Sequence, residues 1–146
     1  MRHLNRIPLS LCLALLVVTA ACRGDRPTET TGTTGAGVKV TDVTLGRAIG
    51  GDRAITDQTD NFRPNDTIYA SVATEGSAAS TTIRARWTFE DGQVVDESTR
   101  TIAPNNREHT EFHISKPNGW PTGKYQLEVF VDDRAVETKK FEVSGN

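Results

Sequence analysis

The stretch TTIRARWTFEDG, residues 81–92, decides the fold class, because apolar and polar side chains alternate along it. One side of the extended chain carries the apolar residues Ile83, Ala85, Trp87 and Phe89. An alternation with a period of two is typical of a β-strand that buries one face and exposes the other. The sequence therefore predicts a strand here, with its tryptophan in the core.

The residues that follow this strand predict a hairpin. Asp91–Gly92 is typical of a type I′ turn, in which both central residues need a positive φ. The next stretch, QVVDESTRTI, covers residues 93–102 and is more polar. We expect it to return antiparallel and to form an edge strand.

Five further stretches suit strands, and no apolar pattern of helical period extends over three turns. The first of them, VKVTDVTLG at residues 38–46, changes phase around Thr41–Asp42, as a β-bulge would make it do. Residues 46–66 show no clear strand pattern, and we expect Phe62 to insert into the core from this segment. Residues 38–146 contain no cysteine, so the sequence predicts one seven-stranded all-β domain without a disulfide.

Two aromatic residues give this domain a resemblance to a known fold. Trp87 lies mid-strand in the third strand, where such folds often bury a tryptophan. In GWPTGKYQLEV, Tyr125 opens the sixth strand two residues before Leu127 and looks like a tyrosine corner, with leucine in place of the cysteine of antibody domains. The domain resembles the immunoglobulin-like or fibronectin-III-like modules of bacterial surface lipoproteins. The resemblance implies an immunoglobulin-like sandwich, but this architecture serves many unrelated functions.

The chain begins with the three parts of an export signal. Arg2 and Arg6 precede an apolar run over residues 9–18, and small residues follow. The apolar run is shorter than the roughly 20 residues that span a bilayer. We therefore expect a cleaved signal peptide over residues 1–21.

The end of this segment, VTAAC at residues 18–22, resembles the bacterial lipobox, although Thr19 stands where leucine is usual. The resemblance implies that Cys22 is lipidated and becomes the new N-terminus; the alternative is an ordinary signal peptide cut near Ala21. No aspartate follows the cysteine, which by resemblance to enterobacterial sorting favours the outer membrane over the inner one. Residues 22–37 are rich in Thr and Gly and predict a flexible linker.

Charge and composition exclude several classes of function. The net charge of −2 argues against a nucleic-acid partner, which usually leaves a basic footprint. The domain lacks both a Gly-x-Ser-x-Gly nucleophile elbow and a free thiol. We predict a non-catalytic protein without a cofactor.

A row of three metal-capable residues lies on one predicted strand. His109, Glu111 and His113 alternate along REHTEFHIS and should share its outer face. A zinc site would need a fourth ligand and supporting hydrogen bonds. The alternative is a solvated face on which Glu111 pairs with an arginine such as Arg84, Arg86 or Arg107.

Two aromatic residues stand out as candidates for binding. Trp120 lies in the turn KPNGWPTG, where it either closes the end of the sandwich as a lid or presents its ring to a sugar or a protein. Phe130 should point outward from the sixth strand, and if it joins Val95 or Val136 across the sheet the outer face carries a small apolar patch. We predict that the domain binds a protein partner at the cell envelope. The alternatives are a carbohydrate- or peptidoglycan-binding module that uses Trp120, and a metal-binding protein.

Overall fold

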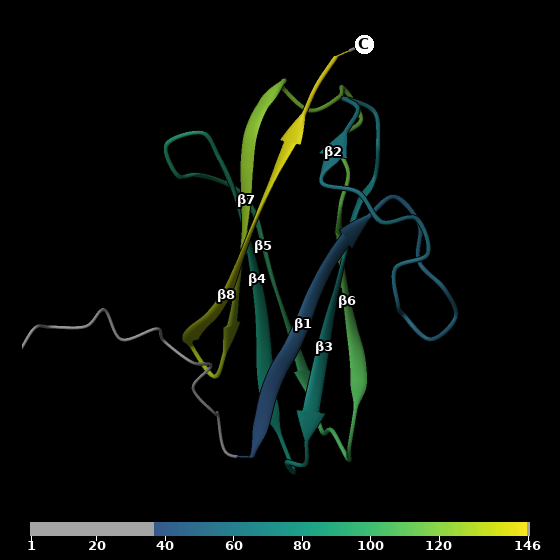
Figure 1. The fold of residues 1–146 in the computed structure, drawn as a ribbon. Coiled ribbons are helices and arrows are strands. Elements are labelled where there is room, and N and C mark those ends of the chain that lie inside the picture. Colours follow the sequence, from purple (N-terminus) through teal and green to yellow (C-terminus); the bar gives the residue numbers. More distant parts are fainter. Residues whose placement is uncertain (1–36, 146) are drawn as a thin grey trace, which may run out of the picture.

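The computed structural model describes residues 37–145, which form two packed β-sheets and no helix (Figure 1). The smaller sheet has the order β1-β3-β6, with β1 at Val38–Gly46, β3 at Ile68–Gly76 and β6 at Glu108–Ile114. The larger sheet has the order β2-β8-β7-β4-β5, with strands at Asn61–Phe62, Arg134–Val143, Gly123–Val131, Thr81–Phe89 and Gln93–Ile102. The predicted sandwich is confirmed: all seven predicted strands are present, and the two-residue β2 is additional.

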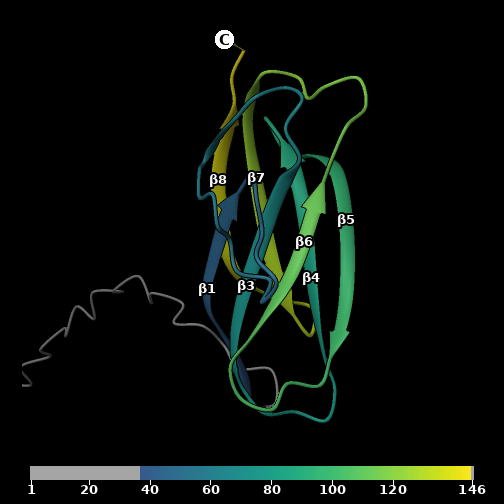
Figure 2. The ribbon, with the colours of Figure 1, turned by 90° about the vertical axis from the view of Figure 1, so that its right-hand side faces the viewer.

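The strands pair antiparallel except at one short place. The two residues of β2 run parallel to the end of β8. Strand β5 ends the larger sheet, as predicted for this polar segment, and Figure 2 shows it at the outside of the molecule. The predicted bulge in β1 is confirmed, because its register against β3 shifts between Val40 and Asp42.

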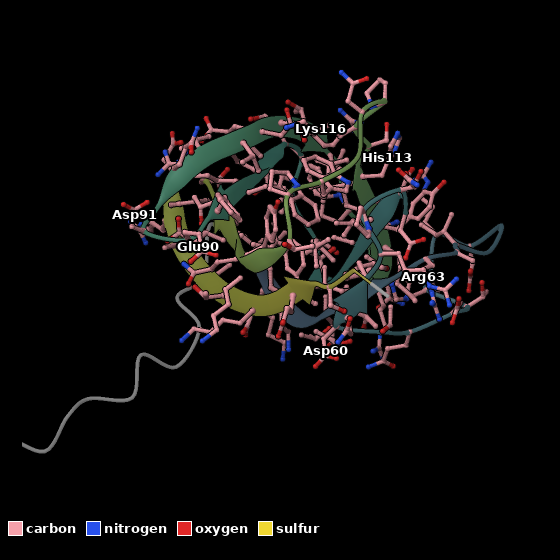
Figure 3. The ribbon with its side chains drawn as sticks, turned by 90° about the horizontal axis from the view of Figure 1, so that it is seen from above. Asp60, Arg63, Glu90, Asp91, His113 and Lys116 are labelled. Atoms are coloured by element: carbon pink, nitrogen blue, oxygen red, sulfur yellow. The ribbon has the colours of Figure 1, made fainter. Side chains whose placement is uncertain are left out.

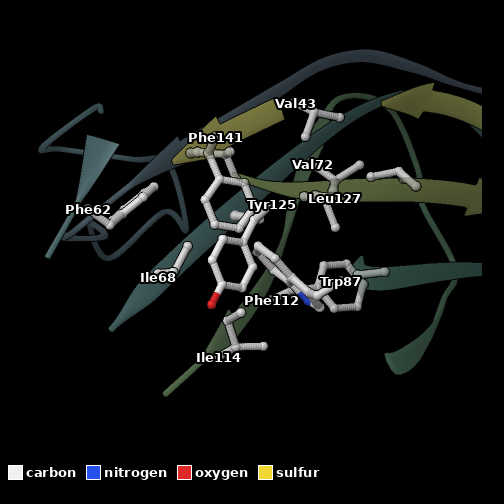
Figure 4. Packing of buried hydrophobic residues seen from close by; sticks show 14 of the residues in the cluster. Val43, Phe62, Ile68, Val72, Trp87, Phe112, Ile114, Tyr125, Leu127 and Phe141 are labelled. Carbon is white, nitrogen blue, oxygen red and sulfur yellow. The ribbon is translucent and has the colours of Figure 1, made fainter. Parts of the chain in front are cut away.

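The core lies between the two sheets, and the end-on view in Figure 3 shows side chains filling that space while labelled charged residues lie around the rim. Ile83, Ala85 and Trp87 are fully buried, as the alternation in β4 predicts. The Trp87 ring meets the Phe141 ring edge-on with centroids 5.8 Å apart, and Phe141 stacks on Tyr125 at 5.3 Å (Figure 4). Such aromatic contacts add stability beyond the burial of area.

The predicted tyrosine corner is confirmed. The Tyr125 hydroxyl donates a hydrogen bond to the Pro121 carbonyl at 2.8 Å, four residues upstream. Leu127, two residues further on, is fully buried where antibody domains have a cysteine. Burial raises the pKa of Tyr125, and the nearby Glu90 carboxylate raises it further, so the hydroxyl keeps its proton and remains a donor.

The hairpin prediction at Asp91–Gly92 is wrong in its turn type. The connection has three residues, 90–92, and the positive φ angles belong to Glu90 at 49° and Gly92 at 105°. The reason lies in the neighbouring strand, because the Glu90 amide donates to the Lys124 carbonyl at 2.8 Å and fixes Glu90 against the start of β7. A two-residue hairpin with both φ angles positive occurs instead between β7 and β8, at Asp132 and Asp133.

Residues 46–66, which show no clear strand pattern in the sequence, contain a small hairpin followed by β2. Isolated bridges join Gly46 to Gln58 and Ile49 to Ile55. Phe62 is fully buried, as predicted, and its ring meets the Phe141 ring edge-on at 5.5 Å.

The predicted signal peptide (residues 1–21), Cys22 and the linker up to residue 36 lie outside the described residues. Among the residues that are described, no helix has the length and apolar character needed to cross a membrane.

Candidate functional site

Phe130 lies on the outer face of the larger sheet and is half-buried. It stands opposite Arg84 of β4, whose guanidinium carbon lies 4.0 Å from the centroid of the phenyl ring. The guanidinium carbon of Arg86 lies 5.3 Å from the same centroid. Both distances suit cation–π attraction. Phe130 therefore points outward, as predicted, and the guanidinium groups of two arginines lie over its ring.

Acidic side chains hold these arginines in place. Glu97 of β5 accepts hydrogen bonds at one oxygen, Oε2, from Arg86 Nε at 2.6 Å and from an Arg84 terminal nitrogen at 3.3 Å. The hydrogen bond from Arg86 lowers the pKa of Glu97 and in return raises the pKa of Arg86. Asp133 accepts a hydrogen bond from the other terminal nitrogen of Arg84 at 3.3 Å. We call the surface formed by Arg84, Arg86, Glu97, Glu128 and Phe130 the Phe130 face.

The apolar patch considered around Phe130 does not form, since Val95 and Val136 pack against the core. Both valines are extra residues at bulges. Val95 lies where the register of β5 against β4 shifts, and Val136 lies where the register of β8 against β7 shifts. A bulge changes which side of the sheet the following residues occupy. Val94 is instead the exposed large apolar residue of the described chain, at 52 % exposure.

Sequence reasoning missed the partnership between Phe130 and its two arginines. It considered Arg84 and Arg86, besides Arg107, as partners of Glu111, which lies in the other sheet from Arg84 and Arg86. The available signal was the alternation in β4, which puts both arginines outward, together with antiparallel pairing of the third and sixth predicted strands.

The three candidate metal ligands on β6 do not converge. His109 Nδ1 lies 3.0 Å from Ser71 Oγ, whose hydroxyl donates to the Arg53 carbonyl at 2.7 Å. His113 Nδ1 lies 2.6 Å from a carboxylate oxygen of Glu111. Within residues 37–145 no group of three His, Cys, Asp or Glu side chains is placed to hold a metal ion. The metal-binding alternative therefore lacks a site in this part of the chain.

Trp120 closes the end of the sandwich, so its proposed use as a sugar platform is not supported. It is only 6 % exposed, its ring meets the Tyr125 ring edge-on at 6.2 Å, and its Nε1–H donates to the Asp66 carbonyl at 3.2 Å. Stacking on a sugar needs a free ring face. The structure places Trp120 as the lid.

A hollow of about 550 Å³ opens near the same end, between the start of β7, the end of β8 and β2. Its charged lining mixes three carboxylates, Asp60, Glu90 and Glu142, with the ammonium groups of Lys124 and Lys140. The Glu90 carboxylate already has a partner within the fold, since it accepts a hydrogen bond from the Lys124 amide at 3.1 Å. Because the hollow presents both carboxylates and ammonium groups, its charge favours neither an anionic nor a cationic ligand.

Comparison with known proteins identifies the fold. No protein-family model matches the chain, and no curated protein is detectably similar in sequence. An immunoglobulin-like protein from Pseudomonas aeruginosa aligns with 75% of this chain and 100% of its own, with 18% identity and a TM-score of 0.52. The fold is immunoglobulin-like. At this identity the likeness concerns the fold alone.

Two other solved structures align more loosely with the immunoglobulin-like domain. A CARDB domain from Pyrococcus furiosus, solved in complex with di-metal ions, aligns with 78% of this chain and 93% of its own, at 19% identity and a TM-score of 0.42. A β-glucosidase from Listeria innocua aligns with 73% of this chain but only 16% of its own, at 8% identity and a TM-score of 0.48.

Proposed function

We propose that this chain is a non-catalytic lipoprotein, anchored through lipid on Cys22, whose immunoglobulin-like domain binds a protein partner at the cell envelope. The observation that carries the binding role is the Phe130 face. An aromatic ring and two ordered arginines lie on a sheet surface with no covering element in the described chain.

The chemistry of this face suits a protein better than a small ligand. Aromatic and arginine side chains are enriched at protein interfaces and carry much of their binding energy. The ion pairs with Glu97 hold both guanidinium groups before a partner arrives, which reduces the ordering cost of binding. The face is also rich in charged groups, whereas small-molecule sites are mostly apolar.

Support for the anchor comes from the sequence. The lipobox-like stretch ends at Cys22, and a polar linker precedes the first strand of the domain. Lipid on the cysteine would keep the domain at the membrane and raise its local concentration there.

A photo-crosslinking experiment tests the binding face. A photoreactive amino acid replaces Thr99, which stands opposite Arg84 at the margin of the Phe130 face. The matched control places it at Glu75, which is 52% exposed on the other sheet. Full-length protein in its native envelope should give one discrete protein adduct from position 99 and none from position 75.

A second variant connects that adduct to the aromatic ring. We expect Phe130→Ala to lower the yield of the adduct at least five-fold, because buried aromatic anchors dominate interface energies. An unchanged melting temperature shows that the domain stays folded. The same adduct from both positions, or a yield unaffected by Phe130→Ala, contradicts the proposal.

A further inference from the structure

Strand β5 has no hydrogen-bonded strand on its outer edge in the described chain. It is the last strand of the larger sheet, it is ten residues long, and Figure 2 shows no other strand of that sheet beyond it. Its sequence, QVVDESTRTI, contains neither proline nor lysine, the residues that commonly block an exposed edge. A free edge presents unpaired backbone N–H and C=O groups to any strand that fits beside it.

The register of β5 against β4 places three of its side chains on the inner side of the sheet. Asp96, Ser98 and Arg100 stand opposite the buried residues Trp87, Ala85 and Ile83. Residues that face each other across antiparallel strands share one side of the sheet. Asp96 and Arg100 are nevertheless exposed, because β5 lies at the edge.

We propose that β5 pairs antiparallel with β5 of a second copy of this chain, around a two-fold axis at Ser98. In this register each Asp96 carboxylate lies opposite the Arg100 guanidinium of the other copy, so the ion pair forms twice. Opposite charges directly across antiparallel strands are stabilising. A surface that complements itself is the requirement for a two-fold dimer.

The same charges select this partner and this register. In the single chain the Arg100 guanidinium carbon lies 5.7 Å from the centroid of the Phe112 ring and has no carboxylate partner in the part of the chain that the structure describes. A strand without matching charges leaves Asp96 and Arg100 without ion pairs at the inner side, and inward-pointing charges are a common protection of free edges. A register centred on Glu97 instead places two glutamates opposite each other, which is destabilising. The Ser98-centred register is the one that pairs both charges of both copies.

The other edge of the larger sheet is less open. Strand β8 carries the adjacent lysines Lys139 and Lys140, and β2 covers its end at Glu142 and Val143. Lysine at an edge discourages the approach of another strand. The dimer through β5 goes beyond the proposed function and does not depend on the lipid anchor.

Disulfide trapping tests the dimer. The full chain has two cysteines, and Cys12→Ser with Cys22→Ser removes both thiols. In this background we expect Ser98→Cys to form a disulfide dimer in a glutathione redox buffer. Residues opposite each other in antiparallel strands have Cα atoms about 4.5–5.5 Å apart, within the range that a disulfide spans.

The matched control is Thr101→Cys, three residues along the same edge. In the Ser98-centred register the two residues at position 101 lie about 20 Å apart, too far for a disulfide. Dimer from Ser98→Cys but not from Thr101→Cys supports the register. Equal trapping at both positions, or none at position 98, overturns the proposal.

Charge reversal tests the ion pairs in the Ser98→Cys chain. We expect Asp96→Arg to slow disulfide formation about ten-fold, since two attractive pairs become repulsive. Adding Arg100→Asp should restore the rate, because both pairs form again with their signs exchanged. Failure of the double reversal to restore the rate, in protein whose circular dichroism shows it to be folded, also overturns the proposal.

Discussion

At the scale of single residues, one turn carboxylate binds a backbone amide and two hydroxyl groups of the neighbouring strand. Asp132 accepts hydrogen bonds from the Thr82 amide at 2.8 Å, the Thr81 hydroxyl at 2.9 Å and the Thr82 hydroxyl at 3.2 Å. The bond from the Thr82 amide is the main cause that lowers the pKa of Asp132. The side chain thus fastens the turn between β7 and β8 to the first residues of β4.

This carboxylate predicts a dependence of stability on pH. A group whose pKa is lower in the folded state than in the unfolded chain stabilises the fold above its unfolded pKa, about 3.9 for aspartate. That contribution is lost as the pH falls through the lower, folded pKa. We expect Asp132→Asn to destabilise the protein at pH 7 by about 1 kcal/mol, because solvent at the turn weakens charged hydrogen bonds.

The measurement is urea unfolding at pH 7 and at pH 3. The difference between wild type and Asp132→Asn should shrink at the lower pH. The neighbouring Asp133→Asn is the matched control, because Asp133 is 89% exposed and makes a single ion pair at 3.3 Å. Equal effects of the two substitutions at pH 7 contradict the role given to Asp132.

At the scale of elements, the strands follow from the sequence but the turns and bulges do not. The alternation in β4 and β7 predicts which side chains are buried, since each strand has one face in the core. The bulges at Val95 and Val136 depend on how two strands are aligned with each other, and one strand's sequence does not contain that information. For this reason the two valines were considered as neighbours of Phe130, although both pack against the core.

The loop before β6 contains a strained residue that gives a further prediction. Asn106 has a φ of 114°, although its amide makes a good hydrogen bond to the Gly76 carbonyl at 3.0 Å. Glycine adopts such angles without steric cost. We expect Asn106→Gly to raise the free energy of unfolding by about 0.5–1 kcal/mol, the relief of strain exceeding the added entropy of the unfolded chain.

Asn105→Gly provides the control in the same loop. Asn105 is bridged to Ser77 and has no positive φ, so glycine there brings only the entropic cost and should destabilise slightly. Thermal melts of both variants measure the difference. A lower melting temperature for Asn106→Gly than for wild type contradicts the strain argument.

At the scale of the whole molecule, the sequence predicts the architecture and leaves the partner open. The tyrosine corner and Trp87 indicate the sandwich because both are requirements of its core. Binding of a partner depends on the side chains at the surface, and many different sets of surface side chains are compatible with the same sandwich. Trp120 shows the difference: a tryptophan in a turn suits a binding platform or a lid, and only its 6% exposure in the fold decides between them.

The anchor leads to a prediction at this scale. We expect Cys22→Ala to move the protein from the membrane fraction to the soluble fraction and to abolish labelling with radioactive palmitate. The physical reason is that each buried methylene of the lipid contributes about 0.8 kcal/mol to membrane binding. Cys12→Ala is the control and should leave both observations unchanged; a membrane-bound, labelled Cys22→Ala protein contradicts the lipidation.

The described chain enters at one pole of the sandwich and leaves at the other, since β1 begins at one end and β8 finishes at the opposite end (Figure 1). A force applied between Val38 and Val143 therefore acts along the strands. The ladder of β1 against β3 and the ladder of β8 against β7 are then loaded in shear, with many hydrogen bonds strained together. We therefore expect the domain to resist extension between these two residues more strongly than a domain whose terminal strands unzip one hydrogen bond at a time.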